Sequence, residues 1–287
     1  MIKKRKERFI LAVIIILFLA ILGAYSFFYL YAPAPPPPDF SAIKAGYCRS
    51  EAILLDRHGN PLHELRMDPQ GRRLEWVPLT QVSPALVKAV IQAEDRRFYR
   101  HQGVDWQALG GAFMNRLLSG PPRGASTITM QLARKLAERE KIRPPKKTLK
   151  GKWRQMQAAH RLEKSWEKEE ILEAYLNLIS FRGELQGVAA ASRGLFDKDP
   201  GGLTEAEALI LTALIPSTSQ SLDRIVRRAE RLGNFLAAPT SPGEIKALVY
   251  ERIGRPYRIS PQIGLAPHVA GLLLKQPGAQ VLSLIHI

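Results

Sequence analysis

The chain has 287 residues, of which 46% are hydrophobic, so it can bury a full core and still carry a second small unit, which excludes a disordered protein. Its formal net charge of +16 favours an anionic partner. Cys48 is the only cysteine in the sequence, which excludes an intrachain disulfide and a cysteine metal cluster.

The N-terminal segment has the charge pattern of a membrane anchor. Residues 3–8, KKRKER, precede 23 residues without charge, 9–31. As a helix rising about 1.5 Å per residue, this run spans about 34 Å, which is enough for a hydrocarbon core of about 30 Å. The basic flank predicts a cytoplasmic tail over 1–8 and one transmembrane helix that places the following residues outside the cytoplasm. A cleaved signal peptide is the alternative, disfavoured by the long apolar run and by Pro35.

Positive charge is concentrated between Arg134 and Arg161. This stretch contains eleven Lys or Arg residues and two acidic residues, Glu138 and Glu140, which gives it a net charge of +9. A patch of this kind attracts nucleic acid, phospholipid head groups or a phosphorylated substrate. Because the predicted topology places it outside the cytoplasm, we expect membrane lipids or a phosphorylated substrate and no nucleic acid.

The rest of the chain divides by its composition. A proline-rich linker is predicted over 32–42, followed by a small β-hairpin region over 43–82 with turn residues near Gly59. From Ser83, expected to cap a helix, the apolar period is helical as far as about residue 235. Helical segments are predicted at 106–118, 126–139, 151–163, 169–179 and 203–215, with a glycine-rich turn and helix at 181–198. Residues 236–287 are assigned to a truncated linker region.

Two polar clusters stand out within the helical part. Glu94 and Asp95 end an apolar helix, and for such a pair the ordinary alternative is a solvated helix end. Ser126, Thr127 and Thr129 begin the helix at 126–139, where their hydroxyl groups and the backbone NH groups can bind an anion. A plain helix cap is the alternative there. The order of these clusters along the chain is more informative than either of them alone.

In this order, the clusters resemble glycosyltransferase family 51, the peptidoglycan polymerase module of class A penicillin-binding proteins. The family's E-D-x-x-F-x-x-H-x-G motif is matched by Glu94, Asp95, Phe98, His101 and Gly103, and its G-x-S-T-x-T-x-Q motif is matched by Gly124, Ser126, Thr127, Thr129 and Gln131. A further motif, I-L-E-x-Y-L-N, is matched at 171–177, with Glu173, Tyr175 and Asn177. The resemblance runs from about residue 50 to about residue 235.

The resemblance implies a mainly α, lysozyme-like glycosyltransferase domain of two helical lobes with a small β element, preceded by one transmembrane helix. It also implies an enzyme that polymerises lipid II into β-1,4 glycan strands and releases polyprenyl pyrophosphate. Glu94 would be the general base, because a sugar hydroxyl is a poor nucleophile until its proton is taken. The substrate-binding residues implied are Asp95, Arg96, Phe98, His101, Gly103, Ser126, Thr127, Thr129, Gln131, Lys152, Arg154, Glu173, Tyr175 and Asn177.

The resemblance further implies a place and partners for the protein. It would reside in the bacterial inner membrane as a single-pass protein with an extracytoplasmic catalytic domain. Its partners would be lipid II, the growing glycan strand, membrane lipids and cell-wall synthesis proteins. An apolar stripe, which could guide the polyprenyl tail or simply pack into the core, consists of Trp106, Leu109, Phe113, Met114 and Leu117.

The sequence departs from the family pattern at three positions. Met130 stands where a glutamine is usual. In the R-K-x-x-E motif, Gly151 replaces the arginine and Gln155 occupies the position of the second catalytic glutamate, whereas Lys152 is retained. The substitutions at Met130 and Gln155 are similar to the penicillin-binding protein 1C branch. We therefore predict no metal ligands and no required cofactor, with a divalent cation, Mg²⁺ or Mn²⁺, as the alternative.

Two other kinds of protein remain as alternatives. A lysozyme-like lytic transglycosylase or hydrolase also uses a helical fold and one glutamate, and Gln155 is compatible with a non-catalytic cell-wall scaffold. Residues 165–168 match the S-x-x-K motif of transpeptidases but lie inside the glycosyltransferase segment, so we discount them. We expect the chain to be a fragment without a transpeptidase half, and we do not assume that its last residues are native.

Overall fold

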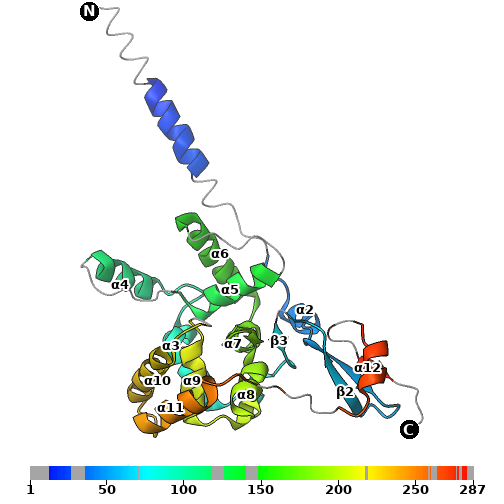
Figure 1. Ribbon diagram of the computed structural model, residues 1–287. Coiled ribbons are helices and arrows are strands. Elements are labelled where there is room, and N and C mark those ends of the chain that lie inside the picture. The colour runs from blue at the N-terminus through cyan, green and yellow to red at the C-terminus, as the bar shows by residue number, and fades with distance from the viewer. Residues whose placement is uncertain are drawn as a thin grey trace, which may run out of the picture.

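A computed structural model of the chain describes its structure in the ranges 13–26, 36–69, 71–117, 126–139, 148–216, 219–257, 264–275 and 280–282, and at residues 259 and 277. The fold is mainly helical, which confirms the predicted class. Figure 1 shows α3, α9, α10 and α11 packed together, α7 and α8 next to them, and the strands with α12 on the other side.

A helix over residues 13–26 stands apart from the other elements in Figure 1, and its large apolar side chains are exposed. Among the described residues, no helix combines the length and the apolarity that crossing a membrane requires. The predicted tail at 1–8, both ends of the predicted span at 9–31 and part of the predicted linker lie outside the described residues. Inside the described part, the linker prediction at 32–42 overlaps α2 (Phe40–Ala45), so the chain is already helical there.

The hairpin predicted from the turn residues is present. Strands β1 (Glu51–Leu55) and β2 (Pro61–Arg66) pair antiparallel. The turn between them is fixed by Asp56, whose carboxylate accepts hydrogen bonds from two backbone NH groups, and by Gly59 with φ +82°. Strand β5 (Gln280–Leu282) pairs with β1 in parallel, and α12 (Pro267–Leu273) packs on this sheet. The predicted linker region therefore contributes to the small β unit.

A buried helix forms the centre of the core. α9 (Glu205–Leu214) is buried at every residue after Glu205, as expected for a helix that is apolar on all sides. Its first turn is closed by a capping box in which Thr204 and Glu207 exchange hydrogen bonds. The helices that pack against α9 are α3 (Pro84–Glu94), α8 (Val188–Phe196), α10 (Leu222–Leu236) and α11 (Pro242–Leu248), and α7 (Lys168–Leu178) belongs to the same core.

Three further helices complete this part of the fold. They are α4 (Trp106–Leu117), α5 (Ile128–Arg139) and α6 (Leu149–Ser165). Two of them, α5 and α6, contribute buried residues to the same core. Their positions confirm the helices predicted at 106–118, 126–139 and 151–163. α5 packs against both α6 and α7, so its N-terminal turn lies where segments distant in sequence converge.

The remaining elements are short. They are the strands β3 (Arg72–Arg73) and β4 (Leu185–Gln186), the 3₁₀ helices η1 (Leu79–Gln81), η2 (Phe98–Arg100) and η3 (Pro200–Gly202), and the π-helix η4 (Val249–Ile253). β3 and β4 pair in parallel, which fastens the segment after the hairpin to the segment after α7.

The predicted serine cap is only partly correct. Ser83 does occupy the position before the first residue of α3, and Pro84 occupies the first turn. The hydroxyl of Ser83, however, donates to the carbonyl of Leu203 at 3.0 Å and does not cap the helix. Ser83 therefore joins α3 to the segment that precedes α9.

Candidate active site

The carboxylate of Glu94 lies at the C-terminal end of α3 and is held from two sides. Its Oε2 accepts a hydrogen bond from Nε2 of Gln131 at 2.9 Å, and its Oε1 accepts one from Nη2 of Arg228 at 2.8 Å. The hydroxyl of Tyr175 donates to Oε1 of Gln131 at 3.0 Å, which fixes the orientation of the amide. The Glu94 side chain is 11% exposed, so it is oriented by the protein and still reaches solvent.

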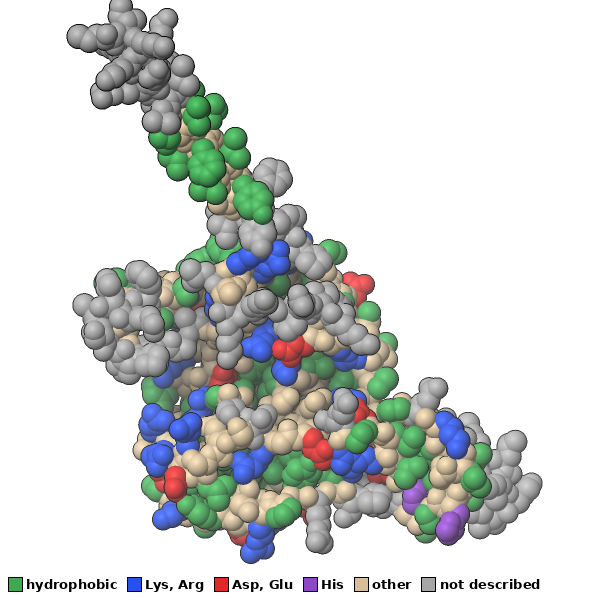
Figure 2. Space-filling model, turned by 45° about the horizontal axis from the view of Figure 1, so that its top comes forward, with side chains coloured by type: hydrophobic (Ala, Val, Ile, Leu, Met, Phe, Trp, Pro, Cys, Tyr) green, Lys and Arg blue, Asp and Glu red, His purple; other side chains and the backbone are tan. Residues whose placement is uncertain are grey.

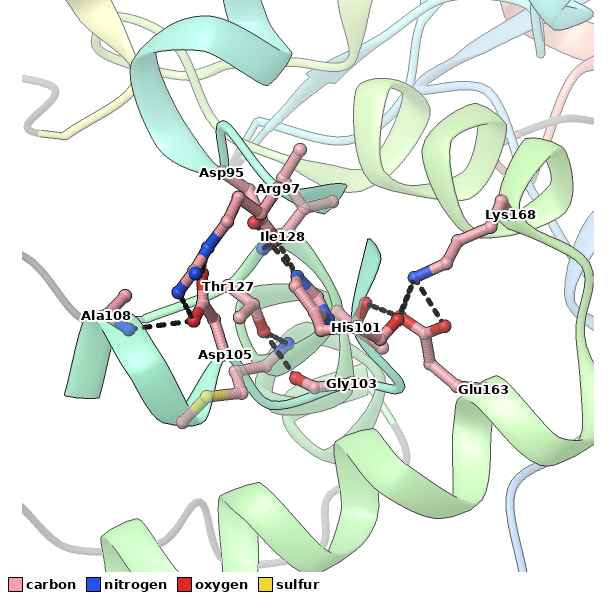
Figure 3. A network of polar contacts seen from close by, with 12 residues as sticks. Asp95, Arg97, His101, Gly103, Asp105, Ala108, Thr127, Ile128, Glu163 and Lys168 are labelled. Carbon is pink, nitrogen blue, oxygen red and sulfur yellow. Dashed lines mark hydrogen bonds and ion pairs between the residues drawn. The ribbon is translucent and has the colours of Figure 1, made fainter. Parts of the chain in front are cut away.

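Asp95, the next residue, faces inwards and fixes the start of α5. Its carboxylate accepts a hydrogen bond from the backbone NH of Ile128 at 3.0 Å and from Nε2 of His101 at 2.9 and 3.0 Å. Figure 3 shows both interactions. The two adjacent carboxylates therefore have different roles. Glu94 points to the site, whereas Asp95 stabilises the start of the helix that carries Gln131.

Gly103 and Thr127 hold the same helix against α6. The hydroxyl of Thr127 donates to the carbonyl of Gly103 at 2.6 Å and accepts from the NH of Met130 at 3.1 Å, which caps the first turn of α5. Gly103 has φ +84°, and an added Cβ would lie 2.6 Å from the backbone of Ala159 in α6. Only glycine fits this position, for reasons of both backbone conformation and space.

A second buried network joins α5 to the C-terminal part of α6 and to the start of α7. Thr129 donates to Oε1 of Glu163 at 2.6 Å, and Lys168 donates to the same atom at 2.7 Å and to the carbonyl of His101 at 2.8 Å. The ammonium group of Lys168 also lies 4.5 Å from the centre of the Phe98 ring. Figure 3 shows Glu163 facing Lys168. Glu163 is therefore engaged in structure and does not replace the missing second glutamate.

Gln155 on α6 stands at the position of that second glutamate, and its side-chain amide makes hydrogen bonds within the protein. Its Nε2 donates to the carbonyl of Met130 at 2.7 Å, and its Oε1 accepts from Nζ of Lys152 at 3.3 Å. Nζ of Lys152 also donates to Oγ of Ser126 at 2.6 Å. Burial, and secondarily the nearby Arg134, lower the pKa of Lys152 below its usual value. The two acceptors that orient this ammonium group are thus neutral.

Glu173 and Asn177 on α7 anchor the segment that leads to α3. The Glu173 carboxylate accepts from Nε1 of Trp76 at 2.7 Å and from the NH of Leu79 at 2.8 Å. Burial opposes ionisation of Glu173, but these hydrogen bonds and Lys44 keep its pKa below the usual value. Asn177 pairs with both backbone groups of Val77.

The predicted substrate-binding residues differ in their exposure and in the contacts that they make. Phe98, Thr129 and Tyr175 are 0% exposed and Asn177 is 1% exposed, so their side chains cannot touch a substrate in this conformation. Asp95, His101, Gly103, Thr127 and Glu173 also use their polar atoms or backbone to position other residues. Glu94, Ser126, Gln131, Lys152 and Gln155 are part-buried around the start of α5, and Arg154 is exposed.

Arg96, also predicted to bind substrate, is turned along the surface. Its Nε donates to the carbonyl of Gln92 at 3.4 Å, and its guanidinium lies 4.4 Å from the ring centre of Phe235. In the apolar stripe of α4, Trp106 and Met114 are exposed at 61% and 51%, whereas Leu109 packs against a buried cluster. The side chains of Phe113 and Leu117 lie outside the described ones.

Sequence reasoning missed Arg228, which pairs with Glu94 from α10. Glu94 and Arg228 are 134 positions apart. α10 contains four arginines, Arg224, Arg227, Arg228 and Arg231, on a strongly amphipathic helix. That amphipathic pattern could have predicted the helix, but no local signal separates Arg228 from its neighbours. Within the described part of the chain, no group of three or more His, Cys, Asp or Glu side chains is placed to hold a metal ion.

Comparisons with known proteins give consistent matches. A family model described as Transglycosylase matches residues 58–236. Penicillin-binding protein 2D of Bacillus subtilis (strain 168) is 40% identical over 56% of this chain and 22% of that protein. Penicillin-binding protein 1C of Escherichia coli (strain K12) is 38% identical over 63% of this chain and 23% of that protein. A biosynthetic peptidoglycan transglycosylase of Rhodospirillum centenum (strain ATCC 51521 / SW) is 36% identical over 55% of this chain and 68% of that protein.

The matched range contains Glu94 and every other predicted site residue. The chain spans only 22% and 23% of the two penicillin-binding proteins, and their identities do not single out the penicillin-binding protein 1C branch. The family is nevertheless established, because its model covers more than half of the chain and a transglycosylase relative is covered over 68% of its length. The chain belongs to the transglycosylase family, glycosyltransferase family 51.

Proposed function

We propose that this chain polymerises lipid II, joining the 4-hydroxyl of an incoming unit to the anomeric carbon of the growing strand, with release of polyprenyl pyrophosphate. The observation that carries this proposal is the orientation of Glu94 by Gln131 and Arg228. An ionised carboxylate has about four lone-pair sites, of which these bonds use two. Each oxygen therefore retains acceptor capacity for the proton of an attacking hydroxyl.

Arg228 supports the basic role of Glu94. Its guanidinium is permanently charged. The charge-assisted hydrogen bond also restricts the carboxylate to one orientation. A general base must be correctly placed to accept a proton, and the Arg228 contact serves this requirement.

In this proposal, the basic side chains of α6 bind and stabilise the leaving pyrophosphate. The ammonium group of Lys152 has three donors, of which Ser126 and Gln155 use two. Because both acceptors are neutral, its positive charge is not cancelled by these partners and can stabilise the charge that develops on the leaving group. Arg154, exposed on the same helix, adds positive charge. Figure 2 shows that Lys and Arg side chains predominate over acidic ones on one face of the molecule.

Gln155 has a more limited role than a catalytic carboxylate. Its amide links Lys152 to the carbonyl of Met130, so it orients the ammonium group. As a neutral group, it has no charge with which to attract a divalent cation to the pyrophosphate site. We therefore propose a polymerase that is insensitive to metal ions, in which the basic side chains of α6 support departure of the leaving group.

The remaining parts of the proposal concern location. The uncharged run at 9–31 and its basic flank support a single-pass anchor in the bacterial inner membrane with the catalytic domain on the extracytoplasmic side. An anchored enzyme would meet a substrate whose polyprenyl tail stays in the bilayer. External protease added to spheroplasts should digest residues beyond 31, and protection of that region would contradict this topology.

The chemical part is tested by Glu94→Gln in purified full-length protein supplied with lipid II. The amide is nearly isosteric but a poor base, so polymer formation should be lost while the melting temperature changes little. Glu205→Gln is the matched control, because Glu205 is exposed at the start of α9. Near-normal polymerisation by Glu94→Gln would refute the role of Glu94. Release of soluble muropeptides by the wild type, instead of polymer, would favour a lytic enzyme.

A further inference from the structure

A polar cavity away from Glu94 lies between α2, β3 and the C-terminal part of α5. Its volume is about 480 Å³, and the residues around it include Tyr47, Cys48, Arg73, Lys135 and Arg139. This volume is in the range of pockets that bind small molecules, about 300–1,000 Å³. Among the described residues that line the cavity, Glu138 is the one acidic side chain, beside three basic ones.

The cations of this cavity are held in place by the protein. Arg139 donates to the carbonyl of Gly46, and its guanidinium lies 6.0 Å from the centre of the Tyr47 ring. Arg73 donates to Oε1 of Gln186 at 3.2 Å and to the carbonyl of Cys48 at 3.1 Å. Arg73 also forms an ion pair with Asp68, so its charge is partly compensated. The carbonyl of Gly46 that accepts from Arg139 is neutral and leaves the charge of that guanidinium uncompensated at this contact.

The carboxylate of Glu138 is shared between two basic side chains. Glu138 accepts a hydrogen bond from Arg134 at 2.9 Å and lies 3.4 Å from Lys135, so two cations share its charge. Burial raises the pKa of Tyr47, so its hydroxyl stays protonated and neutral at physiological pH. The cavity thus offers cations and a neutral hydroxyl, which suits a phosphate oxygen.

The place of the cavity in the chain points to the membrane. The cavity begins at Gly46, directly after α2, and α2 begins nine residues after the end of the predicted anchor at 31. A proline-rich spacer of that length reaches at most about 28 Å at about 3.1 Å per residue. In Figure 1, α2 and α5 lie in the half of the molecule nearer to the helix over 13–26. Phospholipid head groups carry phosphate and lie at the surface of the bilayer to which this spacer would connect the cavity.

We propose that this cavity binds the phosphate group of an anionic phospholipid of the bilayer that anchors the chain. Bound lipid would contact Lys135 and Arg139 at the C-terminal end of α5, whose N-terminal turn carries Gln131 and the carbonyl bound by Gln155. The site would thereby fix the height of the catalytic helix relative to the membrane surface. This inference rests on the proposed membrane orientation but not on the polymerase chemistry, so the two proposals fail separately.

Cys48 provides a test in the native protein, because it is the only cysteine of the chain, is exposed and lines the cavity. The full chain would be placed in phosphatidylcholine nanodiscs and treated with methanethiosulfonate reagents of similar size. After correction for their reactivity with a free thiol, the anionic sulfonatoethyl reagent should modify Cys48 about tenfold faster than the cationic trimethylammonioethyl reagent, since a cleft of one charge concentrates the opposite ion. Equal rates would overturn the proposed anion site.

The lipid is then tested with a neutral thiol reagent, which is not repelled by a charged bilayer. Phosphatidylglycerol added to the nanodiscs should slow the modification of Cys48 several-fold, and the double variant Lys135→Gln/Arg139→Gln should lose this protection. The matched control Arg227→Gln/Lys246→Gln removes two exposed cations from α10 and α11 and should keep it. Protection that persists in the first variant overturns the site. Equal protection by soluble glycerol phosphate in phosphatidylcholine nanodiscs overturns the lipid assignment in favour of a free phosphate ligand.

Discussion

Replacing Lys152 by alanine tests how the pyrophosphate leaves. Nζ of Lys152 lies 2.6 Å from Oγ of Ser126 and 3.3 Å from Oε1 of Gln155. The substitution removes an oriented charge without leaving a carboxylate unpaired at these contacts. Removal of one preorganised electrostatic group typically lowers kcat by about 10²–10³, or about 2.7–4 kcal/mol. We therefore expect kcat to fall by about 100-fold or more. The loss of the two hydrogen bonds should lower the unfolding free energy by only about 1 kcal/mol each.

The assay is polymerisation of purified lipid II at saturating substrate, together with thermal unfolding of each variant. Lys152→Met keeps most of the side-chain volume and should lose as much activity as Lys152→Ala. Lys164→Ala removes an exposed cation from the same helix and should leave kcat nearly unchanged. A nearly silent Lys152→Ala, or equal effects at the two lysines, would refute the assignment.

The pH dependence gives the same hypothesis a second readout. Burial lowers the pKa of Lys152, with a further contribution from Arg134. The charged ammonium is the active form, so kcat should fall as the pH rises through this lowered pKa. Gln155→Glu would place a negative charge beside the ammonium and should move the decline to higher pH. If Gln155→Glu instead turned an inert protein into a cation-dependent enzyme, the metal-insensitive mechanism would be wrong.

Three further predictions follow from the contacts around the site. Gly103→Ala should lower the unfolding free energy measured by urea titration by about 2–4 kcal/mol, because it combines backbone strain at φ +84° with a steric clash against Ala159. The control Gly59→Ala has a similar φ of +82° but no atom within 4 Å of the added Cβ, so it should lower the unfolding free energy by only about 1–2 kcal/mol. Equal losses in the two variants would contradict the packing argument. The pKa of Glu173 is lowered in the folded state, so its contribution to stability is present above its unfolded pKa and is lost as the pH falls through the folded pKa. The melting temperatures of wild type and Glu173→Gln should therefore converge in acid. A difference in melting temperature that does not depend on pH would contradict this role of the Glu173 carboxylate. Arg228→Met should lower kcat about tenfold, about 1.4 kcal/mol, with the fold intact, and unchanged kcat would show that Arg228 does not support Glu94.

Local patterns in the sequence were sufficient to predict most helices around the site. The period of apolar residues predicted α5, α6 and α7, and the hydroxyl residues before α5 predicted its start, where Thr127 caps the first turn. The turn around Gly59 predicted the hairpin of β1 and β2. These features depend on residues close in sequence, whose side chains and backbone decide the local conformation.

Features formed by distant segments could not be predicted in this way. β5 has three residues and pairs with β1, more than 200 positions earlier in the chain, so its own pattern carries almost no information about its partner. Arg228 reaches Glu94 only because α10 packs beside α3. Likewise, the internal bonds of Glu173 to Trp76 and of Glu163 to Thr129 distinguish structural from substrate-facing residues only after the helices are assembled.

Polymerisation of purified lipid II by the full-length wild-type chain, in the presence of Mg²⁺ and after its removal by a chelator, tests the central claim most directly. The arrangement of Glu94 with Arg228, and of Lys152 with the neutral Gln155, predicts glycan polymer at similar rates under both conditions. Absence of polymer under both conditions would contradict the proposed polymerase, and polymer formed only with Mg²⁺ would contradict the proposal that the basic side chains of α6 are sufficient for departure of the pyrophosphate.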